Sequence, residues 1–124
     1  MAVRTALALL VGRIAASAPR PLVAGHVRVG DIVADVAWQT GLRRDDITGP
    51  SRDQRLVRAR DAVCWLAVDA KAASLPTIGR VLGGRDHSTI FAARRRAMER
   101  RRRDPAFARL TERLRERYRD LQED

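Results

Sequence analysis

The chain has 124 residues, which is enough for one small domain and leaves little for a second. Hydrophobic residues make up 45% of the sequence but aromatic residues only 4%, so we expect an all-α fold with an aliphatic core rather than a β-sandwich. A single cysteine, Cys64, excludes an intramolecular disulfide. The formal net charge is +10, and all but one of the 25 basic residues are arginine, which favours a nucleic acid as partner over a membrane surface. The alternative is an arginine-rich surface that contacts only solvent.

Residues 1–25 predict an amphipathic helix followed by a proline-containing linker. The apolar side chains recur at helical spacing and form one stripe, made of Val3, Leu7, Leu10 and Ile14. Pro19 and Pro21 then end the helix. Residues 1–18 also resemble a secretory signal peptide, but the apolar run is short and Arg13 interrupts it. We therefore expect a cytoplasmic protein with no signal peptide and no membrane span.

The next segment predicts a helix, a loop and a longer helix. The first helix covers residues 31–40 and is stopped by Gly41, and residues 42–52 follow as a loop. The longer helix runs from residue 52 or 53 to residue 72. Its predicted core face consists of Leu56 or Val57, Val63, Leu66, Ala67 and Ala70.

Four arginines crowd the first turns of this longer helix, namely Arg52, Arg55, Arg58 and Arg60. Positive charge near a helix N-terminus opposes the helix dipole, at a cost of roughly a few tenths of a kcal/mol per residue. Contact with a phosphate backbone would explain their position. The alternative is a charged face exposed to solvent.

A short helix, a glycine turn and another helix follow, which is the order of a helix-turn-helix motif. Ser74 is placed to cap a helix that starts at Pro76 or Thr77 and ends at residue 82, and Gly83-Gly84 turns the chain. The second helix starts near His87 and carries its apolar side chains inward, at Ile90, Ala93 and Ala97. In a helix-turn-helix, the first residues of the second helix meet base edges in the major groove.

The stretch GGRDHSTI, residues 83–90, carries side chains suited to such a contact. Asp86 can accept a hydrogen bond from a cytosine or adenine amino group, and His87 can donate one to guanine N7 or O6. Ser88 and Thr89 can bond phosphates or bases. Catalysis would need a nucleophile facing Asp86 and His87, whereas neighbours on a helix point to different faces, and the histidines and the cysteine lack metal-site spacing. We therefore expect no enzyme, no metal and no cofactor.

The end of the chain combines a basic block with an amphipathic helix. Residues 85–103 hold eight arginines against two acids, and we expect Arg94 and Arg95 to contact phosphates. Asp104-Pro105 ends this helix, and residues 105–124 form a last one with an apolar stripe of Phe107, Leu110, Leu114, Tyr118 and Leu121. Each terminal helix either enlarges the core or offers a docking face for a co-activator, RNA polymerase or a second copy.

The stretch SLPTIGRVLGGRDHSTI, with DIVADVAWQTG and the residues that follow it, resembles the C-terminal DNA-binding domain of the bacterial replication initiator DnaA. The resemblance implies a DNA-binding domain over residues 26–104 with an additional helix at each end. It also implies that Arg52 enters the minor groove, that Arg60 aligns with a helix arginine of the family, and that residues 85–89 contact the major groove and adjacent phosphates. The candidate DNA-binding residues are Arg52, Arg55, Arg60, Ser74, Leu75, Pro76, Arg85, Asp86, His87, Ser88, Thr89, Arg94 and Arg95.

The sequence departs from this family at several positions. Ala59 and Asp61 replace the usual proline and glutamine, and we expect Asp61 to place a negative charge near a phosphate. The sequence contains no GxxxxGK[ST] motif, and its only lysine is Lys71. We therefore expect no nucleotide binding, no ATP hydrolysis and no melting of a replication origin.

Two functions compatible with sequence-specific binding of duplex DNA remain. The protein could activate transcription, or it could modulate replication by occupying DnaA boxes and excluding the initiator. It resembles standalone DnaA-like activators of alphaproteobacteria, including those of phage-derived gene transfer agent clusters, and this resemblance favours transcription. A nucleoid protein without sequence preference is disfavoured, because the cluster that contacts bases is intact.

Overall fold

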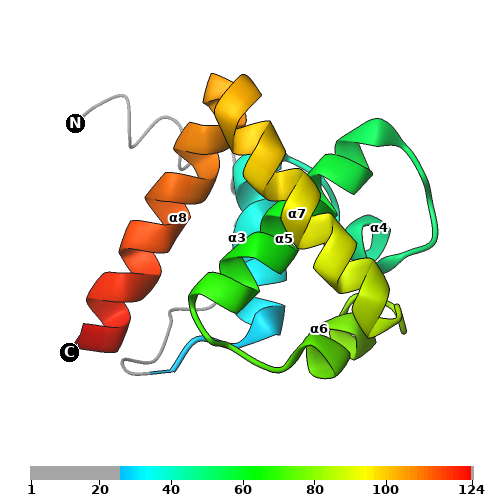
Figure 1. The fold of residues 1–124 in the computed structure, drawn as a ribbon, viewed down its shortest axis with the longest axis horizontal. Helices are drawn as coiled ribbons and strands as arrows, with labels where there is room; N and C mark the ends of the chain where they lie inside the picture. Colours follow the sequence, from blue (N-terminus) through cyan, green and yellow to red (C-terminus); the bar gives the residue numbers. More distant parts are fainter. Residues whose placement is uncertain (1–25, 124) are drawn as a thin grey trace, which may run out of the picture.

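The computed structural model describes residues 26–123, and this part of the chain is entirely helical, without strands. The helices are α3 (Val29–Thr40), α4 (Arg44–Thr48), α5 (Gln54–Asp69), α6 (Leu75–Val81), α7 (His87–Arg103) and α8 (Pro105–Glu123). Helix α5 occupies the centre and contacts each of the other five helices. Helix α7 crosses α5, and α8 folds back from the end of α7 (Figure 1). The predicted all-α fold is confirmed, whereas the predicted N-terminal helix lies outside the described residues.

The helix ends follow the capping residues of the sequence. Gly41 ends α3 in the left-handed conformation, at a φ of 74°. The side chain of Asp53 caps α5 and accepts a hydrogen bond from the Arg55 amide at 2.9 Å. Ser74 caps α6, as predicted, but this helix begins one residue earlier than expected, at Leu75. Proline is tolerated at its second position because the first turn of a helix leaves its N–H groups without intrahelical partners.

The loop predicted over residues 42–52 is partly wrong, because five of its residues form α4. Such a short helix has little stability of its own, and its Arg43 N-cap makes no side-chain hydrogen bond. It is held instead by tertiary contacts, since Ile47 is completely buried and carbonyls of this segment accept hydrogen bonds from Arg60. Neither the burial of Ile47 nor the hydrogen bonds from Arg60 leave a pattern among neighbouring residues, so α4 could not be predicted from the sequence.

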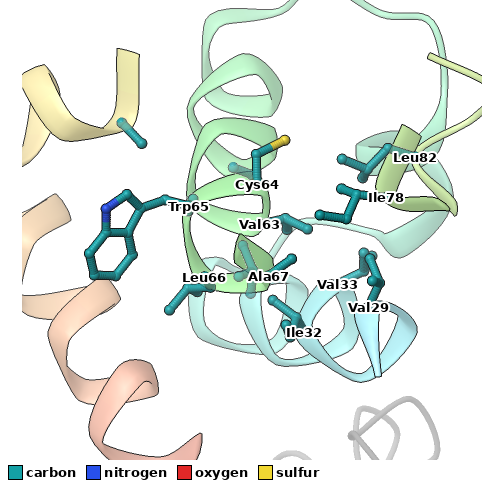
Figure 2. Packing of buried hydrophobic residues seen from close by; sticks show 14 of the residues in the cluster. Val29, Ile32, Val33, Val63, Cys64, Trp65, Leu66, Ala67, Ile78 and Leu82 are labelled. Carbon is teal, nitrogen blue, oxygen red and sulfur yellow. The ribbon is translucent and has the colours of Figure 1, made fainter. Parts of the chain in front are cut away.

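One hydrophobic core joins all six helices. Figure 2 shows Val63, Leu66 and Ala67 of α5 in one cluster with Ile32 of α3, while Trp65 points away from α6, where Ile78 lies. The predicted core face of α5 is confirmed, with Leu56 buried and Val57 half-buried. Helix α5 ends at Asp69 rather than at residue 72, and Lys71 takes a positive φ of 53° just beyond it.

Helix α8 belongs to this same core. Phe107, Leu114 and Tyr118 are buried, while Leu110 and Leu121 remain half-buried. The Tyr118 hydroxyl donates a 2.7 Å hydrogen bond to the Asp35 carboxylate, which links α8 to α3 inside the protein. Phe107, Leu114 and Tyr118 of the last apolar stripe therefore enlarge the core of the domain.

Candidate nucleic-acid interface

The α6–turn–α7 unit is a tightly packed helix-turn-helix. Both glycines of the turn have positive φ, 83° at Gly83 and 78° at Gly84. A Cβ atom on Gly83 would lie 2.1 Å from the Thr48 carbonyl oxygen, and one on Gly79 would lie 2.0 Å from that of Arg85. These glycines therefore let α6 approach the turn and let the turn approach the end of α4.

The start of α7 presents four polar side chains to solvent, those of Asp86, His87, Ser88 and Thr89. Asp86 is also the N-cap of the helix, because its carboxylate accepts hydrogen bonds from the Ser88 amide, at 3.1 Å, and from the Ser88 hydroxyl. These hydrogen bonds, led by that of the hydroxyl, lower the pKa of Asp86. His87 Nδ1 lies 3.5 Å from the same carboxylate. Asp86 is thus an ionised acceptor at neutral pH, and its capping role was missed from the sequence although an aspartate before a helix is a usual signal.

The start of α6 provides a second group of candidate contacts. Ser74 Oγ accepts a hydrogen bond from the Thr77 amide at 3.4 Å, which confirms the predicted cap. Ser74 and Pro76 are exposed, whereas Leu75 is half-buried and packs against the core. Leu75 therefore supports the fold in addition to bordering the surface.

The basic loop, residues 49–53, brings a third group close to α7. Arg52 is exposed and makes no ion pair within the described part of the chain, whereas Arg55 bonds to the Asp53 carboxylate at 3.3 Å. Arg52 and Thr89 line the same cavity of about 710 Å³, which opens between the basic loop and the start of α7. The loop and the helix-turn-helix thus form one continuous surface.

Arg60 stands behind the basic loop and is 7% exposed. Its guanidinium donates to four backbone carbonyls, those of Ile47 at 2.6 Å, Ser51 at 2.5 Å, Gly49 at 2.8 Å and Asp46 at 3.0 Å. Burial, reinforced by the charge of Arg85, lowers the pKa of Arg60. The guanidinium is therefore used to shape the loop that carries Arg52.

Arg85, in the turn between α6 and α7, also donates a hydrogen bond to the basic loop. Its guanidinium donates to the carbonyls of Leu82 and of Gly49, the latter at 2.6 Å. The Gly49 carbonyl thus accepts hydrogen bonds from both Arg60 and Arg85. The two arginines join the basic loop to the turn, so the position of Arg52 relative to α7 is fixed by the fold.

The sequence led us to expect a negative charge of Asp61 near a phosphate, and the structure pairs this charge with arginines of α7. The Asp61 side chain is completely buried and faces α7, where it accepts hydrogen bonds from Arg96 at 3.0 Å and from Arg100 at 3.4 Å. By contrast, Arg95 is exposed and Arg94 half-exposed, and neither makes an ion pair among the described residues. The basic block of the sequence is therefore divided between internal and external arginines.

Phe91 is an exposed side chain whose possible function was not recognised from the sequence. It lies one helical turn after His87, and 49% of its surface is accessible. The i, i+4 spacing from His87 is the signal that could have identified it. A large apolar side chain at this place is suited to contact a thymine methyl group.

Three further observations concern metal ions, membranes and the cysteine within residues 26–123. This segment contains no group of three or more His, Cys, Asp or Glu side chains able to hold a metal ion. None of its helices is long and apolar enough to cross a membrane. Burial raises the pKa of Cys64 to about 12, so its thiol stays protonated at neutral pH and is a poor nucleophile.

Comparison with known proteins agrees with this geometry. The helix-turn-helix model of the bacterial DnaA protein matches residues 29–97. Three similar proteins, each a chromosomal replication initiator protein DnaA, come from Caulobacter vibrioides (36% identity over 83 residues), Caulobacter sp. K31 (32% over 105) and Thermus thermophilus (37% over 82). The alignments cover 67%, 79% and 66% of this chain but only 17%, 22% and 18% of those relatives. The chain therefore belongs to the bacterial DnaA helix-turn-helix family and carries the DNA-binding domain of that family.

Proposed function

We propose that this protein is a transcriptional activator that binds a DnaA-box-like site in duplex DNA, with α7 in the major groove and Arg52 in the minor groove. The observation that carries the proposal is the exposed cluster from Asp86 to Thr89 at the start of α7, whose last member, Thr89, lines the same cavity as Arg52. The N-terminal residues of such a helix are those that meet base edges in helix-turn-helix proteins.

The exposed side chains supply both kinds of contact that a specific complex needs. The Asp86 carboxylate accepts from a cytosine or adenine amino group, His87 donates to guanine, and Phe91 packs on a thymine methyl group. Arg94, Arg95 and Arg55 bind phosphates and orient the domain without selecting sequence. Arg52 inserts where the minor groove is narrow and its negative potential is strongest.

The regulatory role rests on the resemblance to standalone DnaA-like activators, including those of gene transfer agent clusters. Contact with a co-activator or RNA polymerase would involve the outer surface of α8, where Leu110 and Leu121 are only half-buried. Binding to the chromosome would place the protein in the cytoplasm with the nucleoid.

The names of the similar proteins favour a second candidate, in which the protein occupies DnaA boxes and modulates replication without ATPase activity. A genome-wide map of bound sites in cells, combined with transcript levels in a deletion strain, distinguishes the two. Transcriptional activation predicts bound promoters whose transcripts fall in the deletion strain. Bound sites concentrated at the replication origin, with those transcripts unchanged, would support the replication role instead.

A further inference from the structure

Two arginines of α7 are held by one buried carboxylate from α5. The Asp61 side chain is 0% exposed, and it accepts hydrogen bonds from Arg96 Nε at 3.3 Å, Arg96 Nη2 at 3.0 Å and Arg100 Nη2 at 3.4 Å. The guanidinium of Arg100 also lies 5.6 Å from the centre of the Phe107 ring. These contacts direct both guanidinium groups toward the protein.

Arg96 lies beside the surface proposed to bind DNA, and Arg100 lies one helical turn further along α7. The Arg96 side chain is 52% exposed and lines the cavity between the basic loop and α7, while the Arg100 side chain is 25% exposed. A guanidinium that is bonded to a carboxylate must leave it, wholly or in part, before it can pair with a phosphate. Leaving a buried carboxylate without a cation is costly, so Asp61 competes strongly for both arginines.

We propose that Asp61 limits the sequence-independent affinity of this domain for DNA by keeping Arg96 and Arg100 from the phosphate backbone. This inference rests on the proposed DNA binding and adds a residue that controls its strength. Phosphate contacts bind every sequence alike, and each one steepens the dependence of affinity on salt. Arg94 and Arg95, which have no carboxylate partner within residues 26–123, supply such contacts in the wild-type protein.

The variant Asp61→Asn tests this proposal because it removes the charge and keeps the size of the side chain. We would measure the affinity of the full chain for a duplex of random sequence, by fluorescence anisotropy, between 50 and 200 mM salt. One or two additional phosphate contacts should make the slope of log K against log salt more negative by about one to two. The variant should therefore lose about four- to sixteenfold more affinity than the wild type over this range.

Two single variants in the wild-type background serve as matched controls on α7. Arg96→Gln should leave the salt slope unchanged, because Arg96 is engaged by Asp61. Arg95→Gln should flatten the slope by about one, because Arg95 is available to a phosphate. The comparison remains decisive if Asp61→Asn does not fold, since neither control removes the buried carboxylate.

The result that would contradict the role of Asp61 differs from the result that would contradict the proposed function. A folded Asp61→Asn variant with the wild-type slope, or an Arg96→Gln variant flattened as much as Arg95→Gln, contradicts the role of Asp61. Wild-type protein that binds random DNA but prefers no site contradicts the proposed function alone, and the slopes still test Asp61. Wild-type protein that binds no duplex contradicts both.

Discussion

The arginines of α7 are used in two different ways. In the first half, Arg94 and Arg95 make no ion pair among the described residues, and Arg95 is exposed. In the second half, Arg101 donates to Glu112 at 2.7 Å and lies 4.1 Å from the centre of the Trp65 ring. The first pattern leaves charge for a polyanion, whereas the second fastens α7 to α5 and α8. The charge of a segment therefore does not tell how much of it is available to a partner.

The basic loop and the start of α5 show the same division between an exposed arginine and a buried one. Arg52 is exposed at the tip of the basic loop, while Arg60 is buried beneath it and bonded to its carbonyls. We propose that Arg52 contacts DNA, whereas Arg60 holds the loop that carries Arg52. A variant of Arg60 should therefore lower the stability of the fold, whereas a variant of Arg52 should lower only the affinity for DNA.

The largest effect should come from Arg60→Ala. This change leaves four backbone carbonyls without their donor and removes a buried side chain, so we expect a loss of about 3 kcal/mol in the free energy of unfolding. For a domain of this size, the melting temperature should fall by about 10 °C or more. Circular dichroism measures the melting temperature, and anisotropy with duplex DNA should show that affinity falls as well.

Arg52→Ala is the control for this prediction. It should weaken binding to a specific duplex but leave the melting temperature within about 2 °C of the wild type, because an exposed side chain without an ion pair contributes little to stability. A wild-type melting temperature for Arg60→Ala would contradict the role of Arg60 in holding the loop.

A smaller effect, confined to specificity, is expected from His87→Ala. Loss of a base contact should reduce the discrimination between a specific and a random duplex by about 1–3 kcal/mol. Asp86→Asn is a matched variant, because asparagine also caps a helix but replaces one acceptor oxygen with a donor. Competition between a specific and a random duplex measures the discrimination of both variants. Wild-type discrimination in the two variants would contradict a contact between the start of α7 and the bases.

The features that could be predicted from the sequence are those with local signals. Glycine at the turn, serine at the α6 cap and the apolar period of α7 all act within a few residues, so the helix-turn-helix and its exposed cluster were found. Helix α4 and the roles of Arg60 and Asp61 depend on partners that are distant in the sequence. Arg60 bonds to carbonyls 9 to 14 residues away, and Asp61 to arginines 35 and 39 residues away. A charged residue in isolation gives no sign of whether it faces such a partner or solvent.

The smallest effect should come from Phe91→Ala. The ring is exposed in the free protein, so its removal should leave the melting temperature unchanged. Loss of an apolar contact with a thymine methyl group should weaken specific binding by about 1 kcal/mol. Met98→Ala, which alters the other large exposed apolar side chain of α7, is the control and should bind as the wild type. Equal losses in the two variants would show that Phe91 has no special place at the interface.

Selection of bound duplexes from a randomised pool tests most directly whether α7 and the basic loop together recognise a DNA sequence. The experiment would be carried out near physiological salt with the wild-type chain and with Arg52→Ala. We predict that the wild type enriches one motif similar to a DnaA box, with an A/T-rich segment where the minor groove narrows. The Arg52→Ala variant should enrich the rest of the motif but lose the preference for A/T pairs in that segment. A wild-type protein that retains the random pool without enrichment of any motif would contradict sequence-specific recognition by this surface.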